Sequence, residues 1–560
     1  MRRFVVSLAV AALAACGGGS STGAGTDLGP DLPKADAPDT AVDDDAAADE
    51  ASRDGTAGDP TGDEAVTGDE AATGDEAATG DETAIGDETA IGDETTGGDD
   101  TTAADDAPTE SGPDACALAI DHAPAAGLEL GQDLVVVAKA PGATSMTLSW
   151  RPHPDAAQQQ AAMAEVPGGW EATVPAGGIT FWGVRYAIEA TATGCASAKD
   201  DFEVPVHGEL RVTSKPDVYD YSPDVHGRYV VFSKEKPLDE DDLFLFDLWT
   251  FEESAIVTAA KSQGDAHVDG GYVAWVDRRA AADDEDPNSD VWLLDLASGE
   301  EHRVTSDPAG QYGVTIAGRI VAWRDDRHMT GEIDGDVYLY DMGPDGRFGT
   351  GDDPGEIRLT PHPADQTAPS VWTDGTRVLV AWYDMRDDAD GRCDAACDWN
   401  VFLYDFGPDG MHGTADDAGP TRVTSDAHEQ QSPVVSGRRI AWTDARGGNW
   451  LKPDIYWYDL GPDLLFGTAD DGGEARLDVP AVEPQDLDFD GDRLLYTDFR
   501  NGNWDLWLYD FASGLETQVT SHARGQFYGR VHGKTVVWQD ARANEPDGEP
   551  FDDVWARVLP

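Results

Sequence analysis

A repeated pattern of short strands occupies the sequence from about residue 209 to residue 560. Each unit contains a strand of the type apolar-Ala-Trp-x-Asp-x-Arg, followed by a strand that ends in Asp. One copy runs from Ser432 to Arg446 and continues at 454–459 and 475–477. The units recur every ~42 to 63 residues, and a unit of this size cannot bury its apolar face without a neighbour. The repeat therefore predicts sheets that are packed against one another.

Seven copies of the pattern predict a closed ring of sheets. Six copies are regular, and a degenerate copy lies at 230–232. The last copy stops after its third strand, whereas a strand of the fourth type, Arg-Val-Thr-Ser, stands in front of the first copy at 211–214. A strand borrowed from the other end closes a ring and removes exposed sheet edges. We therefore predict an all-β fold with a seven-bladed β-propeller over 207–560. Six blades are the alternative if the degenerate copy is irregular.

The repeats resemble the TolB-like propeller repeats of periplasmic and cell-surface proteins. The resemblance is clearest in the segment Asn-Gly-Asn-Trp-Asp at 501–505, and it extends over about residues 209–560. It implies a surface for partner binding, which in some cases is recruited for glycan chemistry. It does not extend to the residues that precede the repeat.

Residues 116–206 predict a small β-sandwich in front of the propeller. Four segments have the composition of strands, and Gly- or Pro-containing turns separate them; they lie at 134–137, 146–150, 170–174 and 186–190. A strand-rich segment of this length, with Cys116 and Cys195 near its ends, is similar to an immunoglobulin- or fibronectin-like sandwich. We expect a spacer, with carbohydrate binding as the alternative.

Residues 16–115 cannot form an apolar core. They are mainly Gly, Ala, Thr, Asp and Glu, and from Thr61 a hexapeptide of the type Thr-Gly-Asp-Glu-Ala-Ala repeats. Low hydrophobicity with dense like charge predicts disorder, and the regular glycines disfavour a helix. We expect an acidic tether that spans on the order of 55 Å as a neutral coil, and more with self-repulsion. A calcium-binding RTX-type repeat would need a different nonapeptide.

The first sixteen residues resemble a bacterial lipoprotein signal. Two arginines precede an apolar run at 4–13, which is too short to span a bilayer. The run ends in Leu-Ala-Ala-Cys16, which resembles the lipobox. We therefore predict a signal peptide over 1–15 and lipidation of Cys16, with an ordinary secretory signal as the alternative. Gly17 is not the Asp of the common inner-membrane retention signal, so we expect export and a lipid anchor in the outer membrane, on its periplasmic or outer side.

The remaining cysteines and the net charge agree with export. An even set of four cysteines in an exported chain predicts disulfides. We expect Cys116 and Cys195 to bracket one segment, and Cys393 and Cys397 to close a small loop. A metal site at the second pair would need further soft ligands nearby. The formal net charge of −72 argues against nucleic-acid binding and favours solubility, cation binding or basic partners.

Two polar series accompany the repeat. An Asp-x-Arg pair ends the second strand of six units, and its repetition indicates a structural role: Asp277/Arg279, Asp325/Arg327, Asp384/Arg386, Asp444/Arg446, Asp498/Arg500 and Asp540/Arg542. A glutamine precedes the first strand of six units, where it could form a polar collar at the mouth of the central channel: Gln263, Gln311, Gln366, Gln430, Gln485 and Gln526. The collar could bind a ligand, but satisfying backbone groups is the preferred interpretation.

Three acidic inserts are candidate calcium sites. Each has the form Gly-Pro-Asp-(three residues)-Gly-Thr-x-Asp-Asp, and the carboxylates are Asp345, Asp352, Asp353, Asp409, Asp416, Asp417, Asp463, Asp470 and Asp471. Three carboxylates among glycines suit a hard cation, although the spacing differs from an EF-hand. An acidic hairpin with Asx-turns is the alternative. All three inserts are expected between third and fourth strands, on one face of the ring, and a bound Ca²⁺ would be structural.

The sequence contains none of the common enzyme motifs. It lacks a Gly-x-Ser-x-Gly elbow, a His-Glu-x-x-His, a Walker loop and a Gly-x-Gly-x-x-Gly. We therefore expect a non-catalytic lipoprotein that displays a propeller for binding a protein or a polysaccharide of the envelope. The alternative is a glycan-active hydrolase or lyase with its site in the propeller channel. Such an enzyme should break the repeat with a unique cluster of His, Tyr, Arg or carboxylates at the channel mouth.

Overall fold

The computed structural model describes residues 116–213, 218–236, 240–283, 286–329, 334–387, 398–543 and 552–559. The predicted signal peptide, Cys16, the acidic tether and the Cys393/Cys397 pair lie outside these residues. The described residues form strands and two short 3₁₀ helices, Ala176–Gly178 and Ala541–Ala543, which confirms the all-β prediction. Within them, no helix is long and apolar enough to cross a membrane.

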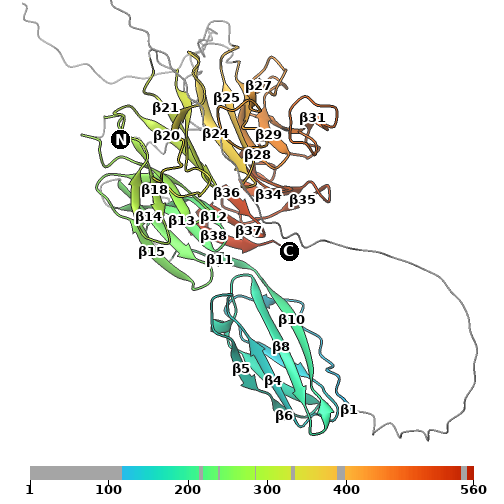
Figure 1. Cartoon of the computed structure of the whole chain (residues 1–560). Coiled ribbons are helices and arrows are strands. Elements are labelled where there is room, and N and C mark those ends of the chain that lie inside the picture. Colours follow the sequence, from blue (N-terminus) through green and yellow to red (C-terminus); the bar gives the residue numbers. More distant parts are fainter. Residues whose placement is uncertain are drawn as a thin grey trace, which may run out of the picture. The chain divides into compact units, whose positions relative to one another are not determined.

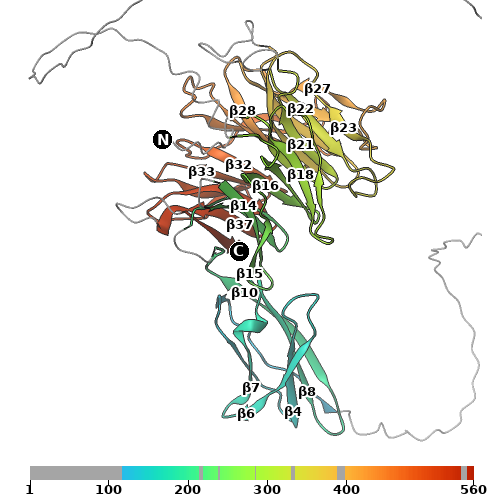
Figure 2. The same cartoon turned by 90° about the vertical axis from the view of Figure 1, so that its left-hand side faces the viewer.

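The strands before residue 208 form two layers (Figures 1 and 2). One sheet has the order β2-β10-β8-β4-β5, and the other has the order β3-β7-β6. Their bounds are β2 (Leu128–Glu129), β3 (Leu134–Ala138), β4 (Ser145–Trp150), β5 (Gln159–Ala162), β6 (Ala164–Val166), β7 (Gly169–Val174), β8 (Gly183–Thr191) and β10 (Ala198–His207). Alternation of apolar and polar residues explains the layers, because Val136, Leu148 and Ile188 are fully buried between them.

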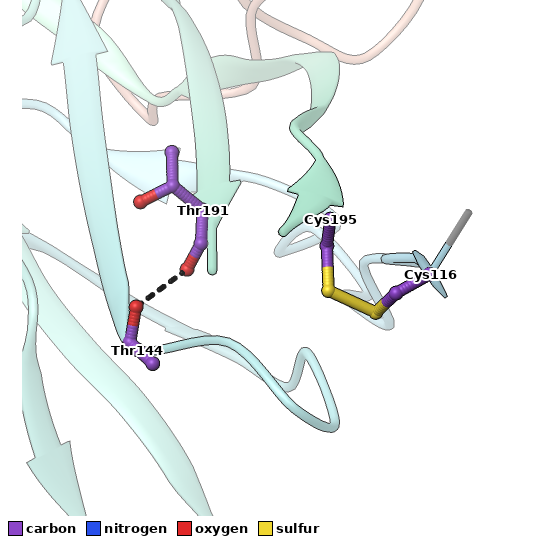
Figure 3. The surroundings of a disulfide bond; sticks show 4 residues. All are labelled: Cys116, Thr144, Thr191 and Cys195. Atoms are coloured by element: carbon purple, nitrogen blue, oxygen red, sulfur yellow. Dashed lines mark hydrogen bonds between the residues drawn. A yellow bond between two sulfur atoms is a disulfide. The ribbon is translucent and has the colours of Figure 1, made fainter. Parts of the chain in front are cut away.

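A disulfide joins the two ends of this region. Cys116 and Cys195 are bonded to each other and lie on β1 (Cys116–Ala117) and β9 (Cys195–Ala196), which pair in parallel. Close to this bond, the Thr144 hydroxyl donates a hydrogen bond to the Thr191 carbonyl over 3.2 Å (Figure 3). The predicted disulfide between Cys116 and Cys195 is therefore present.

The repeat forms seven four-stranded sheets in the described part of the chain. The first strands are β12 (Asp220–His226), β16 (Gln263–Asp269), β20 (Gln311–Ala317), β24 (Gln366–Thr373), β28 (Gln430–Ser436), β32 (Gln485–Asp490) and β36 (Gln526–His532). The second strands are β13 (Tyr229–Lys236), β17 (Tyr272–Asp277), β21 (Ile320–Asp325), β25 (Val378–Asp384), β29 (Arg439–Asp444), β33 (Arg493–Asp498) and β37 (Thr535–Asp540). The third strands are β14 (Glu240–Asp247), β18 (Asp290–Asp295), β22 (Asp336–Asp341), β26 (Asn400–Asp405), β30 (Asp454–Asp459), β34 (Asp505–Asp510) and β38 (Asp553–Val558). The fourth strands are β15 (Glu252–Val257), β19 (Glu301–Arg303), β23 (Gly355–Arg358), β27 (Ala418–Arg422), β31 (Gly473–Arg476), β35 (Leu515–Gln518) and β11 (Glu209–Arg211).

The first strands surround the axis of a closed ring. Each contacts the first strand of the next sheet, and β36 contacts β12, so the order returns to its start. The fourth strand of the last sheet is β11, which comes from the front of the repeat and pairs antiparallel with β38. Figure 1 shows the red strands β37 and β38 beside the green strands β11 to β13. The predicted β-propeller, including its borrowed closing strand, is therefore present.

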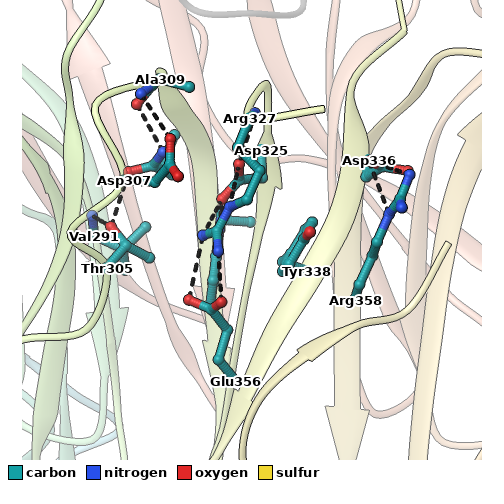
Figure 4. Close-up of polar contacts among 12 residues, drawn as sticks. Val291, Thr305, Asp307, Ala309, Asp325, Arg327, Asp336, Tyr338, Glu356 and Arg358 are labelled. Atoms are coloured by element: carbon teal, nitrogen blue, oxygen red, sulfur yellow. Dashed lines mark hydrogen bonds and ion pairs between the residues drawn. The ribbon is translucent and has the colours of Figure 1, made fainter. Parts of the chain in front are cut away.

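A buried tryptophan on the second strand is held by the Asp-x-Arg pair. Trp323 is fully buried, and its indole nitrogen donates to Asp325 over 2.9 Å. The same carboxylate accepts the backbone N–H and the guanidinium of Arg327. Arg327 also pairs with Glu356 on the fourth strand and lies over the ring of Tyr338, 4.5 Å from its centroid (Figure 4). Four other sheets repeat the Trp–Asp bond, between Trp275 and Asp277, Trp382 and Asp384, Trp442 and Asp444, and Trp538 and Asp540.

The degenerate first copy still forms a complete sheet, with different charges. Phe232 replaces the tryptophan, and because it has no N–H group it needs no carboxylate partner. Lys234 stands where the other units have Asp, and its ammonium lies 3.6 Å from Asp220 and 2.6 Å from Glu253. Asp220 in turn stands where most other units have Gln. Burial raises the pKa of Asp220 to about 7, and Lys234 opposes this rise.

The Trp–Asp–Arg network is predicted to be a major source of stability. Asp325→Ala leaves the indole N–H of Trp323 and the guanidinium of Arg327 without their buried partner. Removing one member of such a buried pair costs about 3–5 kcal/mol. Asp478→Ala, at an exposed position of the ring, should change stability by less than about 0.5 kcal/mol. Urea denaturation of both variants measures the difference, and equal stabilities would contradict a structural role for the pair.

Candidate functional site

Charged side chains gather on four of the seven first strands. We call them the central cluster, and its members are Asp224 and His226 on β12, Asp265, His267 and Asp269 on β16, Asp486, Asp488 and Asp490 on β32, and Arg530 and His532 on β36. These four strands are neighbours around the ring, in the order β32, β36, β12, β16. Six aspartates therefore face one arginine and three histidines at the axis.

The other three first strands carry uncharged residues at the matching positions. In the strand register, these are Gly313, Thr315 and Ala317, then Ala368, Ser370 and Trp372, and then Ser432, Val434 and Ser436. The alternating residues of each strand, such as Val225 and Val268, are buried between sheets. The fold therefore needs the alternating apolar residues at all seven strands, but it does not need the charges. The central cluster breaks the symmetry of the repeat.

A β-bulge in every first strand positions these side chains. Each strand shifts register against its neighbour at the same place. One residue at each bulge has a left-handed backbone, with φ between 48° and 58°, and the seven residues are Ser222, Asp265, Gly313, Ala368, Ser432, Asp486 and Tyr528. Only one of the seven is glycine. Bulges redirect side chains, and a left-handed backbone at non-glycine residues is strained.

Backbone amides orient the carboxylates of the central cluster. Asp224 accepts a hydrogen bond from the Val268 amide over 2.8 Å, which links β12 to β16. Asp488 accepts from Val531 over 2.6 Å, and Asp490 accepts from Gly533 over 2.6 Å. Each of these carboxylates uses one oxygen to bind the next strand of the ring. The carboxylates are therefore held in place. On the uncharged strands, Ser370 and Ser436 accept the same kind of bond from the next sheet, so this link does not require a charge.

Two histidines of the cluster are paired with aspartates. The Nδ1 atom of His226 lies 2.8 Å from Asp269, and this hydrogen bond raises the pKa of His226. The Nδ1 atom of His267 lies 3.4 Å from Asp224. Burial lowers the pKa of His267, but the hydrogen bond and charge of Asp224 outweigh it, so the net pKa is raised. Both rings are thus favoured in the cationic form.

The pKa of the third histidine, His532, is lowered, in contrast to those of His226 and His267. The His532 ring lies 4.1 Å from that of His226, measured between centroids. Burial lowers the pKa of His532, and the neighbouring charge of His226 lowers it further. The two rings cannot both be protonated without repulsion at short range. The pair therefore carries a single proton over a range of pH.

Arg530 is the single arginine of the central cluster, and four carboxylates surround it. The charges of Asp488, Asp224, Asp486 and Asp265 raise its pKa against the effect of burial. Burial raises the pKa of Asp488 to about 6, and Arg530 opposes this rise. Burial also raises the pKa of Asp486, whose Oδ2 atom is buried without a hydrogen-bond partner.

The predicted glutamine collar is mostly buried in the structure. Gln263, Gln311, Gln366, Gln430 and Gln526 are fully buried. Each donates from its amide nitrogen to a backbone carbonyl two residues earlier, for example from Gln311 to Ala309 over 2.7 Å. Gln485 is exposed. These contacts favour the structural interpretation of the five buried amides over an open ligand-binding collar.

The acidic inserts lie between third and fourth strands, as expected. In the first insert, the Thr350 hydroxyl lies 2.7 Å from Asp352, 2.8 Å from Asp353 and 3.4 Å from Asp345. A hydroxyl has one proton and can donate to only one of these carboxylates at a time. The second insert repeats the arrangement around Thr414, and the third repeats it around Thr468. Carboxylate oxygens of Asp345, Asp352 and Asp353 lie within 4.8 Å of one another, as do those of Asp463, Asp470 and Asp471.

The first glycine of each insert permits this turn. Gly343, Gly407 and Gly461 have φ values of 70°, 72° and 71°. A Cβ atom at any of them would lie 2.6 Å from an oxygen of Asp352, Asp416 or Asp470, respectively. The carboxylate oxygens converge, and this donor set suits Ca²⁺. The second insert differs from the other two. Among the described residues, the carboxylate oxygens of Asp409, Asp416 and Asp417 do not all lie within 4.8 Å of one another.

Inspection of single motifs missed the central cluster. Its members are separated by more than 200 residues, and each strand carries only two or three of them. The cluster could have been found by aligning the seven first strands with one another, because the positions that face the axis are charged in only four of the copies.

Comparison with solved structures finds other propellers at low identity. The β-propeller domain of the Trilobed protease from Pyrococcus furiosus is 13% identical over 61% of this chain and 95% of that chain, with a TM-score of 0.42. Oligogalacturonate lyase in complex with manganese is 14% identical over 63% and 93%, with a TM-score of 0.43. TolB from Acinetobacter baumannii is 15% identical over 59% and 80%, with a TM-score of 0.31. No protein-family model matches the sequence, and no curated protein matches it. The similarity concerns the fold.

The histidine pair yields a prediction about pH. His226 should titrate above the ordinary histidine pKa of about 6.5 and His532 below it. Asp269→Asn removes the partner of His226, so it should lower the pKa of His226. Because its pKa is raised by folding, His226 stabilises the native state below about pH 6.5, and this contribution fades as the pH rises through its folded pKa. Imidazole NMR titration measures both values, with Asp201→Asn as the control. Unchanged pKa values in the Asp269 variant would contradict the pairing.

Proposed function

We propose that this chain is an exported lipoprotein that displays a propeller as a binding platform, with the central cluster as its ligand site. The ligand is a protein or a polymer of the cell envelope. The observation that carries this proposal is the set of charged residues on four neighbouring first strands, because the fold does not require them. The ten residues of the cluster converge from strands at both ends of the repeat.

The proposed anchor rests on the sequence. The Leu-Ala-Ala-Cys16 segment resembles a lipobox, and two or three acyl chains would hold the protein stably at a membrane. The acidic segment that follows suits a spacer. The disulfide between Cys116 and Cys195 agrees with an oxidising compartment.

A catalytic role is the second candidate, and one observation favours it. The central cluster contains the histidines, arginine and carboxylates that a propeller enzyme would need at its axis. Asp488, with a pKa of about 6, and His226 next to His532 are suited to proton transfer near neutral pH. A glycan-active hydrolase or lyase would use such groups as acid and base.

The binding platform can be tested by capture from an envelope extract. The bait is the full-length chain purified in detergent. We expect one partner to be retained by the wild type and lost with Asp486→Asn/Asp488→Asn, because this variant changes two charges of the central cluster. Asp200→Asn/Asp201→Asn removes the same charge at exposed positions of β10 and should retain the partner. A partner kept equally by both variants would contradict the proposed site, whereas glycan turnover that the cluster variant abolishes would favour the enzyme.

We also propose that the acidic inserts bind Ca²⁺ as a structural ion. Three carboxylates converge on one hydroxyl in each insert, and their mutual repulsion is relieved by a bound divalent cation. The ion would fix the link between third and fourth strands and would take no part in ligand chemistry.

Calcium should raise the thermal stability of the protein. A ligand that binds only the native state at 100 times its dissociation constant adds about 2.7 kcal/mol. Asp352→Asn/Asp470→Asn should abolish most of the increase in Tm, whereas Asp478→Asn should keep it. Differential scanning calorimetry with Ca²⁺ and with a chelator measures the effect. An equal increase in all three proteins would show that the inserts are acidic hairpins without a specific ion.

A further inference from the structure

We propose that the central cluster recognises a cationic side chain, the ammonium of a lysine or the guanidinium of an arginine, presented by a basic segment of a partner protein. This inference rests on the proposed binding platform and specifies the chemistry of its ligand.

The first argument is the balance of charge at the axis. Six aspartates of the cluster face one arginine and two histidines, His226 and His267, that are favoured in the cationic form, so the carboxylates still outnumber the cations. The whole chain adds a net charge of −72. Such a field attracts cations and repels anionic polymers. A neutral ligand would leave the excess of carboxylates uncompensated.

The second argument is the unfilled bonding capacity next to Arg530. Its guanidinium donates a hydrogen bond from Nη1 to the Gly529 carbonyl, and within the described residues it forms no ion pair at 4.0 Å or less. Asp486 has a buried Oδ2 atom with no partner. Burial raises the pKa of Asp488 to about 6, although Arg530 and the Val531 amide both oppose this rise. A second cation would supply the missing donors to these two carboxylates.

The third argument is access. The side chains of Asp265, His226, His267 and Asp269 are 46%, 37%, 23% and 22% exposed. Solvent therefore reaches the cluster along β12 and β16. Asp486, Asp488 and Asp490 are spaced two residues apart on β32, so neighbouring aspartates lie ~7 Å apart along the strand. A long, linear side chain such as lysine spans one such step.

These features favour a protein over an amine-bearing glycan. At the cluster positions of the seven first strands, the aromatic residues besides the three histidines are Trp372 and Tyr528. Trp372 lies on β24, away from the four charged strands. The charged strands therefore offer carboxylates for a point charge, with few aromatic faces on which a sugar ring could stack. An amine-bearing glycan becomes an outcome of the test.

The test measures binding of an acetylated, amidated hexalysine peptide to the full-length protein in detergent. Isothermal titration calorimetry is done at about 150 mM salt, where exposed charges are screened beyond ~8 Å. We expect Asp486→Asn/Asp488→Asn to weaken binding by about tenfold or more, which corresponds to a loss of ~1.4 kcal/mol or more, because the peptide cation loses two charged partners. Asp200→Asn/Asp201→Asn should change it less than about twofold. Equal weakening by both variants would show non-specific attraction and overturn the proposal.

Arg530→Gln gives an independent test by the sign of its effect. Removing the internal cation makes the cluster more negative, so it should tighten binding of the hexalysine peptide. A ligand recognised through an anionic group would bind more weakly to this variant. Weaker peptide binding by a folded Arg530→Gln protein would therefore overturn the proposal, as would binding of a glucosamine oligomer or of spermidine without binding of the peptide.

The capture experiment separates this inference from the binding platform on which it rests. A captured partner that depends on Asp486 and Asp488, together with no binding of hexalysine, would leave the platform intact and refute only the cationic ligand. A captured partner that does not depend on these residues would refute both.

Discussion

The hydrogen bond between a buried tryptophan and an aspartate two residues later is the interaction on which the ring depends. The tryptophan fills the space between sheets, but its N–H group needs an acceptor that water cannot supply there. Residues two apart in a strand lie on the same face, so the aspartate at that spacing reaches the indole. The arginine two residues further on neutralises the carboxylate and packs on the third strand, as Arg446 does over Tyr456. One short motif therefore satisfies a polar group, balances a charge and joins three strands.

Two copies of the repeat show that the aspartate is needed as an acceptor for the indole N–H group. In the first sheet, Phe232 removes the N–H group, and the aspartate is replaced by Lys234. In the sixth sheet, Tyr496 takes the tryptophan position and bonds to Glu516 through its hydroxyl. Asp498 is kept there, and it accepts the backbone amide of Val482 over 2.7 Å in place of an indole. The partner changes whenever the donor changes.

The sequence was sufficient to predict the strands, the closing strand and the disulfide, because each follows from local spacing or from counting. The bulges were not predictable, since Ser222 and Tyr528 adopt a left-handed backbone that normally indicates glycine. The glutamines were visible, but their burial depends on how the preceding loop folds back over them. The central cluster could not be recognised from a motif, because its members come together only through the closure of the ring.

The closing strand has a consequence for the order of events in folding. The cluster draws on β12 and β16 near the front of the repeat and on β32 and β36 near its end, and these four strands flank the joint where β11 meets β38. Contacts between residues this distant in sequence form slowly. A chain that is synthesised from its N-terminus contains the early strands well before the late ones. The central cluster therefore does not exist on an incomplete chain, and it forms only when the last strands of the repeat have joined the ring.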